Sequence, residues 1–195
     1  MRPPIVLVLL LVAAPASAAD NQIRPFVGGT FGGGTTFVDL EHAAGKWNPV
    51  LGVSFVTLKN IFGLDVELAD APGFFQGDDS GLVLSSRVTT LTGNVVVAAP
   101  RSKTEYGLRP YLLGGAGIMR TRKKDYFAVF PETRVLAAID VGAGAVGFFT
   151  NRSGVSWEIR RFEGLGGTNE VPGTTLGKPP RLSFWRATMA FVYRY

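Results

Sequence analysis

Six charged side chains stand within stretches of sequence that are apolar at alternate positions. They are Asp65, Glu67, Asp140, Glu158, Arg160 and Arg186. If these groups face a common interior, they must pair, because an unpaired charge removed from water is costly. One interpretation is a gate, in which Arg160 or Arg186 changes its carboxylate partner and opens a narrow conduit. The other is a fixed polar plug, and the cost of separating enclosed charges favours the plug.

The glycine-rich segments resemble nucleotide-binding motifs only in spacing. Residues 142–147 read GAGAVG, which matches a dinucleotide fingerprint. That motif requires a helix N-terminus directly after it, and residues 148–152 instead read as an aromatic strand end and a turn. The glycines at 28–29 and 32–34 lack the Gly-Lys-Ser/Thr that completes a phosphate loop. We therefore expect no cofactor and no nucleotide site.

His42 is the sole histidine of the chain, and cysteine is absent. No serine or aspartate stands beside His42 at a recognisable catalytic spacing, so a solvated loop histidine is the favoured interpretation. A transition-metal site would have to consist mostly of carboxylates. We expect no catalytic residues and no metal site.

The strongest structural signal is alternation at the C-terminus. From Trp185 onward every second residue is apolar, and the residues between them include Arg186, Thr188 and Arg194. Successive side chains of a strand point to opposite faces, so this segment predicts a strand with one apolar and one largely polar face. The same pattern occurs at residues 64–68, 90–97 and 155–160. Weaker windows cover residues 24–33, 50–58, 110–119 and 135–149.

Composition limits where the apolar residues can go. The 195 residues are 46% hydrophobic and 18% charged, with 25 glycines. Residues 1–19 combine Arg2, a short apolar run and small residues at cleavage spacing, which predicts a secretory signal peptide cleaved after Ala18 or Ala19. The remaining residues 20–195 carry 19 basic and 15 acidic residues, a net charge of +4. This scattered excess does not indicate nucleic-acid binding, and no apolar run is long enough for a spanning helix.

The eight windows are separated by connections that alternate in length. Short connections fall at residues 59–62, 98–105 and 150–153, and longer ones at 34–48, 70–86, 120–134 and 163–181. This is the layout of an outer-membrane barrel with short periplasmic turns and long extracellular loops. We therefore predict an all-β, eight-stranded antiparallel up-and-down transmembrane β-barrel over residues 20–195.

Closure into a barrel decides which way the charges face. In hydrocarbon an unpaired backbone group costs several kcal/mol, so spanning strands must form a sheet without edges. An arginine or lysine facing lipid near the midplane costs about 2–4 kcal/mol. The six charged residues are therefore expected inside the barrel. Arg161 breaks the alternation, and we expect it near the outer edge of the membrane.

The chain resembles the small bacterial outer-membrane β-barrels, the OmpA-like transmembrane and porin-family β-barrel domains. The resemblance spans the whole predicted mature chain. It includes GLDVEL and APGFF at residues 63–68 and 71–75, and RPYLLGGAG at residues 109–117. The C-terminal strand is similar to the signal that the barrel-assembly machinery recognises, although family members more often end in phenylalanine than in tyrosine. The residues of this expected assembly signal are Trp185, Met189, Phe191, Tyr193 and Tyr195.

Further expectations concern the two membrane interfaces. We expect an aromatic girdle at the periplasmic strand ends. Its expected members are Tyr106, Tyr111, Phe148, Phe149, Tyr193 and Tyr195. The basic residues Arg120, Arg122, Lys123 and Lys124 form either a lipopolysaccharide contact or a solvated loop. The expected partners are outer-membrane lipid and lipopolysaccharide, with the assembly machinery and periplasmic chaperones during biogenesis.

Several functions fit this prediction. The leading hypothesis is an outer-membrane protein with a structural or surface-interaction role and no catalysis. A narrow passive channel gated by lumen Arg/Glu pairs is the alternative, and a lipid A-modifying or phospholipid-modifying barrel enzyme is a weaker one. A soluble lipocalin-like barrel also alternates, but it would carry its apolar residues inside. The ligand and the oligomeric state are not encoded in any recognisable motif.

Overall fold

The computed structural model describes residues 19–35, 47–74, 83–100, 107–125, 132–165 and 182–195. Residues 1–18 of the predicted signal peptide, His42 and Tyr106 lie outside these ranges, as do the side chains of Lys123 and Lys124. In the described part of the chain, no helix is long and apolar enough to cross a membrane.

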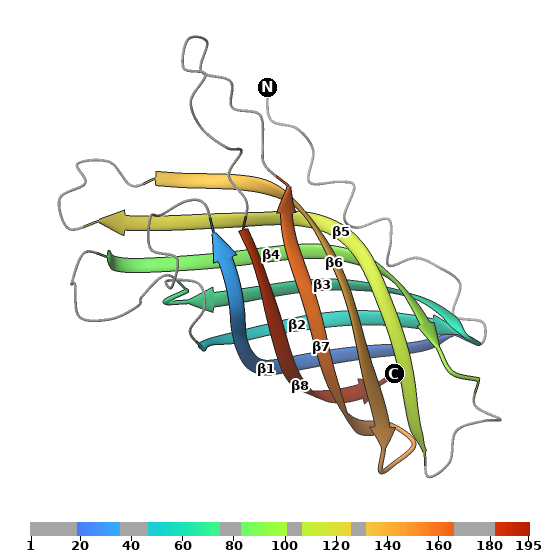
Figure 1. Cartoon of the computed structure of the whole chain (residues 1–195). Coiled ribbons are helices and arrows are strands. Elements are labelled where there is room, and N and C mark those ends of the chain that lie inside the picture. The colour runs from blue at the N-terminus through green and yellow to red at the C-terminus, as the bar shows by residue number, and fades with distance from the viewer. Residues whose placement is uncertain (1–18, 36–46, 75–82, 101–106, 126–131, 166–181) are drawn as a thin grey trace, which may run out of the picture.

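Eight antiparallel strands close into a single barrel (Figure 1). Each strand pairs with the next in the sequence, and β8 pairs with β1 to complete the ring. The prediction of a closed, eight-stranded, all-β barrel is therefore confirmed. The strands are β1 Asp20–Thr35, β2 Asn48–Lys59, β3 Phe62–Pro72, β4 Val83–Ala98, β5 Leu108–Asp125, β6 Glu132–Phe148, β7 Ser153–Leu165 and β8 Leu182–Arg194.

The two ends of the barrel differ in their connections. We call the end with residues 60–61, 99–107 and 149–152 the turn end, and the end with residues 36–47, 73–82, 126–131 and 166–181 the loop end. The barrel seam is held at the turn end, where Tyr195 N donates to Asn21 O at 3.1 Å. There Arg194 also forms a two-pronged ion pair with Asp20, with N···O distances of 2.6 and 2.9 Å.

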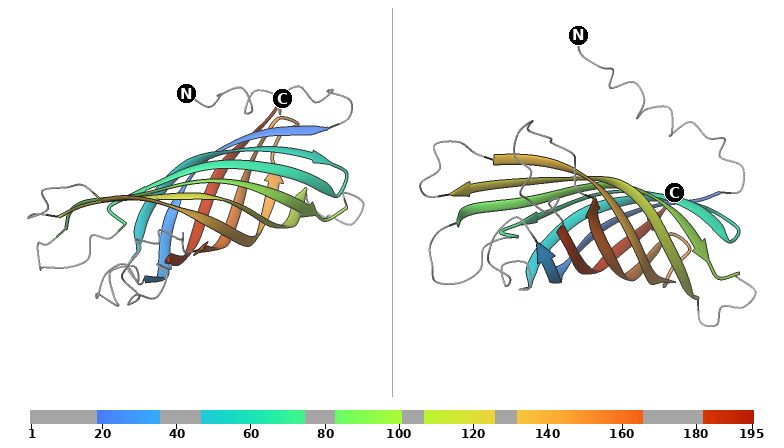
Figure 2. Two further views of the ribbon diagram at one scale, coloured as in Figure 1. Left: turned by 90° about the horizontal axis from the view of Figure 1, so that it is seen from above. Right: turned by 45° about the horizontal axis from the view of Figure 1, so that its top comes forward.

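The strands extend farther than the sequence windows at the loop end. The connection expected over residues 120–134 is mostly strand, and β5 and β6 leave only residues 126–131 between them. β4, β5 and β6 continue past the last pairs that β3 and β7 offer them, and Figure 2 shows these three strands projecting together. Residues 120–125 and 132–134 lack alternating apolar side chains, although their backbones still pair with neighbouring strands.

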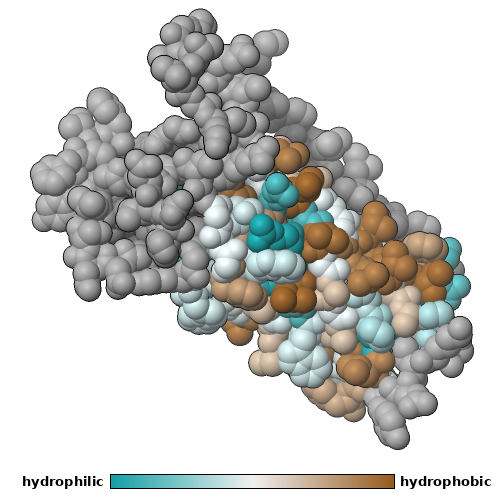
Figure 3. Space-filling model, viewed as in Figure 1, coloured by the Kyte–Doolittle hydropathy of each residue, from teal (hydrophilic) through white to brown (hydrophobic). Residues whose placement is uncertain are grey.

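The outer face of the barrel is largely apolar, and the buried charged residues of the strands face the lumen. On β3, Leu64, Val66 and Leu68 are 55%, 43% and 50% exposed, whereas Asp65 and Glu67 between them are each 1% exposed. Apolar side chains gather over the face that Figure 3 shows. A soluble ligand-binding barrel would have the reverse arrangement, so this distribution excludes the lipocalin-like alternative. The outer face is built for contact with lipid.

The lumen is filled by three layers of side chains. At the loop end, an apolar layer contains Phe74, Met119, Phe162, Leu182 and Phe184, all at most 2% exposed. At the turn end, a second apolar layer is formed by residues such as Leu58, Val96 and Val192. The charged residues lie between them. Eight strands enclose an interior that side chains can fill, and here they do so.

Candidate functional site

The six charged residues predicted to face the interior lie in the middle layer of the lumen; together they are called the lumen ion cluster. Asp65 and Glu67 come from β3, Asp140 from β6, Glu158 and Arg160 from β7, and Arg186 from β8. The period-two alternation of each strand turns these side chains inward while their neighbours face lipid. Five of the six residues are at most 5% exposed, and Glu158 lines a small cavity beside them.

Arg160 is the centre of the lumen ion cluster. Its Nη2 lies 2.9 Å from Asp65 Oδ2 and 3.1 Å from Glu67 Oε2, and its Nη1 lies 3.2 Å from Asp140 Oδ2. Its Nε donates to Glu158. One guanidinium group thus binds carboxylates from three strands, which ties β3, β6 and β7 together through the lumen.

Arg186 supplies the second cation of the cluster. Its Nη2 donates to Glu67, and its guanidinium lies 4.5 Å from the ring centroid of Phe162 and 5.2 Å from that of Phe26. Cation–π contacts strengthen when they are removed from water. Arg186 therefore joins the charged layer to the apolar layer at the loop end.

Uncharged side chains add hydrogen bonds to two of the carboxylates, Asp65 and Glu158. Ser54 donates to Asp65 Oδ1, and Asn94 Nδ2 donates to Asp65 Oδ2 at 3.1 Å. Tyr111 donates its hydroxyl proton to Glu158 Oε2 at 2.9 Å. Buried charges are tolerated when their lone pairs are satisfied in this way.

Placing Tyr111 in a periplasmic girdle was wrong, and so was placing Phe148 there. Tyr111 is 4% exposed and faces the lumen, and Phe148 packs inward under the guanidinium of Arg194, 3.9 Å from its ring centroid. The alternation is ambiguous at both positions because apolar residues occupy both faces of these strand ends. Phe149, Tyr193 and Tyr195 do face outward, with 64%, 40% and 69% of their surface exposed.

Arg24 is a further buried arginine beside the cluster, which the sequence analysis did not single out. Its Nε and Nη2 donate to Gln22 Oε1 at 3.0 and 2.7 Å, and its Nη1 donates to Tyr111 at 3.2 Å. Among the described residues, no carboxylate forms an ion pair with it. The sequence signal for Arg24 is its place as the one charged residue of the strand window at residues 24–33.

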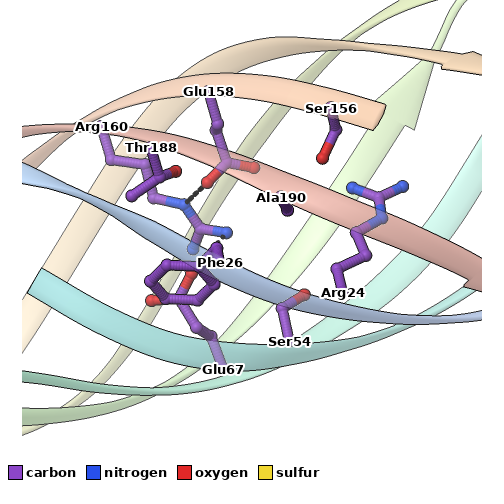
Figure 4. A pocket seen from close by; sticks show the side chains of 9 residues that line it. All are labelled: Arg24, Phe26, Ser54, Glu67, Ser156, Glu158, Arg160, Thr188 and Ala190. Atoms are coloured by element: carbon purple, nitrogen blue, oxygen red, sulfur yellow. Dashed lines mark hydrogen bonds and ion pairs between the residues drawn. The ribbon is translucent and has the colours of Figure 1, made fainter. Parts of the chain in front are cut away.

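A small cavity lies between Arg24 and the lumen ion cluster. Its volume is about 10 Å³, and the residues around it include Ser54, Ser156, Glu158 and Ala190. Figure 4 shows Arg24 on one side of this space and the Glu158–Arg160 pair on the other. Such a volume holds about one water molecule, so it is not a passage for solutes.

Arg161 and the residues of the expected assembly signal lie on the outer wall. The residues of the expected assembly signal all face outward from β8 and the C-terminus, and Trp185 is 39% exposed. Arg161 faces outward near the end of β7, where its guanidinium lies over the Trp185 ring at 5.5 Å and donates to Ser183 at 3.2 Å. In the described ranges, no three acidic or histidine side chains are arranged to hold a metal ion.

Comparisons with known proteins give structural likeness without sequence likeness. No family model matches the chain, and no curated protein matches it. Neisserial surface protein A (NspA) superposes with a TM-score of 0.62 at 12% identity over 93% of this chain and 100% of that one. The chain has the fold of the small outer-membrane β-barrels.

Two Pseudomonas aeruginosa proteins share this fold. OprG superposes with a TM-score of 0.62 at 13% identity, over 91% of this chain and 96% of that one. The N-terminal β-barrel domain of OprF gives a TM-score of 0.53 at 15% identity, over 91% and 99% of the two chains. The apolar outer face agrees with this fold, because both belong to a barrel whose wall faces membrane lipid.

Proposed function

We propose that this protein is a non-conducting and non-catalytic outer-membrane barrel that acts through its loop end, in a structural or surface-interaction role. The observation that carries this proposal is the filled lumen, in which the lumen ion cluster lies between two apolar layers. A hydrated pathway would have to cross both layers. What the barrel does is therefore assigned to its outer surface and to the connections at its loop end.

The contacts of Arg160 support a fixed plug over a gate. Arg160 binds four carboxylates, so releasing one of them leaves three in place. Opening a conduit requires several of these contacts to break together in a poorly hydrated interior. Removing one partner of a buried pair costs about 3–5 kcal/mol, which is too much for frequent spontaneous opening.

A narrow channel is the second candidate function, and Arg24 is the observation that favours it. Arg24 lies across the small cavity from Glu158 and has no described carboxylate partner. A movement of Glu158 from Arg160 to Arg24 would rearrange the middle layer. The apolar layers would still have to open, and for that reason we rank this function second.

Planar-bilayer conductance separates the two functions. We expect the folded wild-type protein to give no conductance steps, and Glu158→Gln and Glu67→Gln to remain equally silent. Regular conductance steps in the wild type, with a changed amplitude or frequency in Glu158→Gln, would show that the protein is a channel and would contradict the proposed function. Mass spectra of lipid A and phospholipids, with and without expression, should be identical, and a new product would contradict the absence of catalysis.

A further inference from the structure

Three arginines form a basic patch on the outer wall at the loop end. Arg87 is on β4, and Arg120 and Arg122 are on β5. All three are exposed and face away from the lumen. We call them the arginine patch.

The strand register brings these like charges together. Arg87 is the direct cross-strand partner of Arg122, and Thr89 is that of Arg120. Directly opposed like charges destabilise a sheet. Arg87 has an ion pair with Asp70 at 3.3 Å, but neither Arg120 nor Arg122 pairs with a carboxylate in the part of the chain that the structure describes. The patch therefore has an excess of positive charge that an anion would offset.

The position of the arginine patch selects the kind of anion. On the same outer face, Leu91 of β4 and Ile118 of β5 pair with each other and are 43% and 49% exposed. Arg120 is two residues beyond Ile118 toward the loop end, a rise of about 7 Å along the strand. The guanidinium groups thus follow directly after the lipid-facing band, at the level where acyl chains give way to headgroups.

We propose that the arginine patch binds phosphate groups of lipids in the outer leaflet. This inference rests on the proposed function, because it requires the loop end to face the outside of the cell. Arginine presents a planar fork of donors that binds phosphate in a two-pronged manner. Continuity with the lipid-facing band favours a lipid-borne phosphate over a soluble polyanion, which would approach from the loop tips.

Native mass spectrometry of the barrel released from nanodiscs tests this proposal. The nanodiscs contain phosphatidylcholine with either lipopolysaccharide or its enzymatically dephosphorylated form, and the charge-removing variant is the double substitution Arg120→Gln and Arg122→Gln. We expect the variant to retain lipopolysaccharide at least about tenfold less than the wild type. This is the size of effect that losing charged hydrogen bonds produces. The dephosphorylated lipid should be retained equally, and weakly, by both proteins.

Two further variants serve as controls. Arg152→Gln removes the same charge from an exposed position at the turn end and should bind like the wild type. The double substitution Arg120→Lys and Arg122→Lys keeps the charge but not the planar fork, and should give intermediate retention. Heat-modifiable migration on gels checks that every variant is folded.

Two results would overturn the proposal. The first is equal retention of lipopolysaccharide by the wild type and the double variant. The second is arginine-dependent binding of a soluble sulfated polysaccharide without any preference for phosphorylated lipid, which would reassign the patch to a soluble polyanion. In both cases, folded and silent barrels in planar bilayers would leave the proposed function intact.

Discussion

Arg160 on β7 and Asp65 on β3 come from opposite walls of the barrel, and Arg160 Nη2 lies 2.9 Å from Asp65 Oδ2. β3 and β7 are four strands apart in either direction around the ring. A direct contact between them means that side chains bridge the lumen at its middle. Through this contact the lumen ion cluster links opposite walls of the barrel.

Replacing Arg160 should strongly destabilise the barrel. Arg160→Met leaves four carboxylates in the lumen with Arg186 as the one remaining cation of the cluster, so we expect a loss of about 3–5 kcal/mol. Urea unfolding in lipid vesicles, followed by the loss of heat-modifiable migration, measures this change. The matched control is Arg152→Met, which removes an exposed arginine and should unfold like the wild type. Equal stability of the two variants would show that Arg160 does not stabilise the barrel.

Tyr111 and Tyr193 should respond differently to loss of the hydroxyl group. Tyr111→Phe removes the donor to Glu158 in the lumen and should cost about 1–3 kcal/mol. Tyr193→Phe changes an outward ring that is 40% exposed, and should leave the free energy of unfolding nearly unchanged. The same urea titration measures both variants. A larger loss of unfolding free energy for Tyr193→Phe would contradict this prediction, because the outward tyrosine would then stabilise the barrel more than Tyr111 does.

Gly117 and Gly93 provide a pair of matched glycine substitutions. A Cβ at the inward-facing Gly117 would lie 2.0 Å from the backbone oxygen of Leu91, whereas one at the outward-facing Gly93 would meet nothing within 4 Å. We expect Gly117→Ala to destabilise the barrel by about 1–3 kcal/mol through forced backbone shifts. Gly93→Ala should stay within about 0.5 kcal/mol of the wild type. Comparable losses would mean that close strand packing at Gly117 is not required.

The C-terminal strand should matter more for assembly in cells than for stability. Phe191→Ala and Tyr195→Ala remove outward aromatic rings that are 48% and 69% exposed. Since neither ring packs in the lumen, refolding from urea into detergent should be little affected. Recovery of the folded, heat-modifiable form from outer-membrane fractions should fall several-fold. If both variants accumulated normally in that fraction, the expected assembly signal would lie elsewhere.

Sequence alone predicted the fold where alternation is strict. Leu64, Val66 and Leu68 alternate with Asp65 and Glu67, so both faces of β3 are assigned without knowledge of its neighbours. The strand number and the closure follow from four strictly alternating windows, four weaker ones, and the requirement for an edgeless sheet in lipid. The loop-end bounds of β5 and β6 were missed because residues 120–125 and 132–134 are polar on both faces of these strands.

The detailed site was only partly predictable, because its contacts join distant parts of the chain. The inward direction of Asp65 and Arg160 follows from local alternation, but their pairing depends on strands that are 95 residues apart in sequence. Tyr111 shows the limit most clearly, since tyrosine suits either a lipid interface or a lumen. Its partner Glu158 is 47 residues away, and no local pattern indicates that pair.

The most direct test of the filled lumen is the access of a charged thiol reagent to its middle layer. The chain has no cysteine, so a single Ser54→Cys substitution places one small probe beside the lumen ion cluster, and Asn151→Cys is the exposed control at the turn end. We predict that a membrane-impermeant methanethiosulfonate reagent labels Asn151→Cys fully and leaves Ser54→Cys unlabelled until the barrel is unfolded. Rapid labelling of Ser54→Cys in the folded barrel would contradict it.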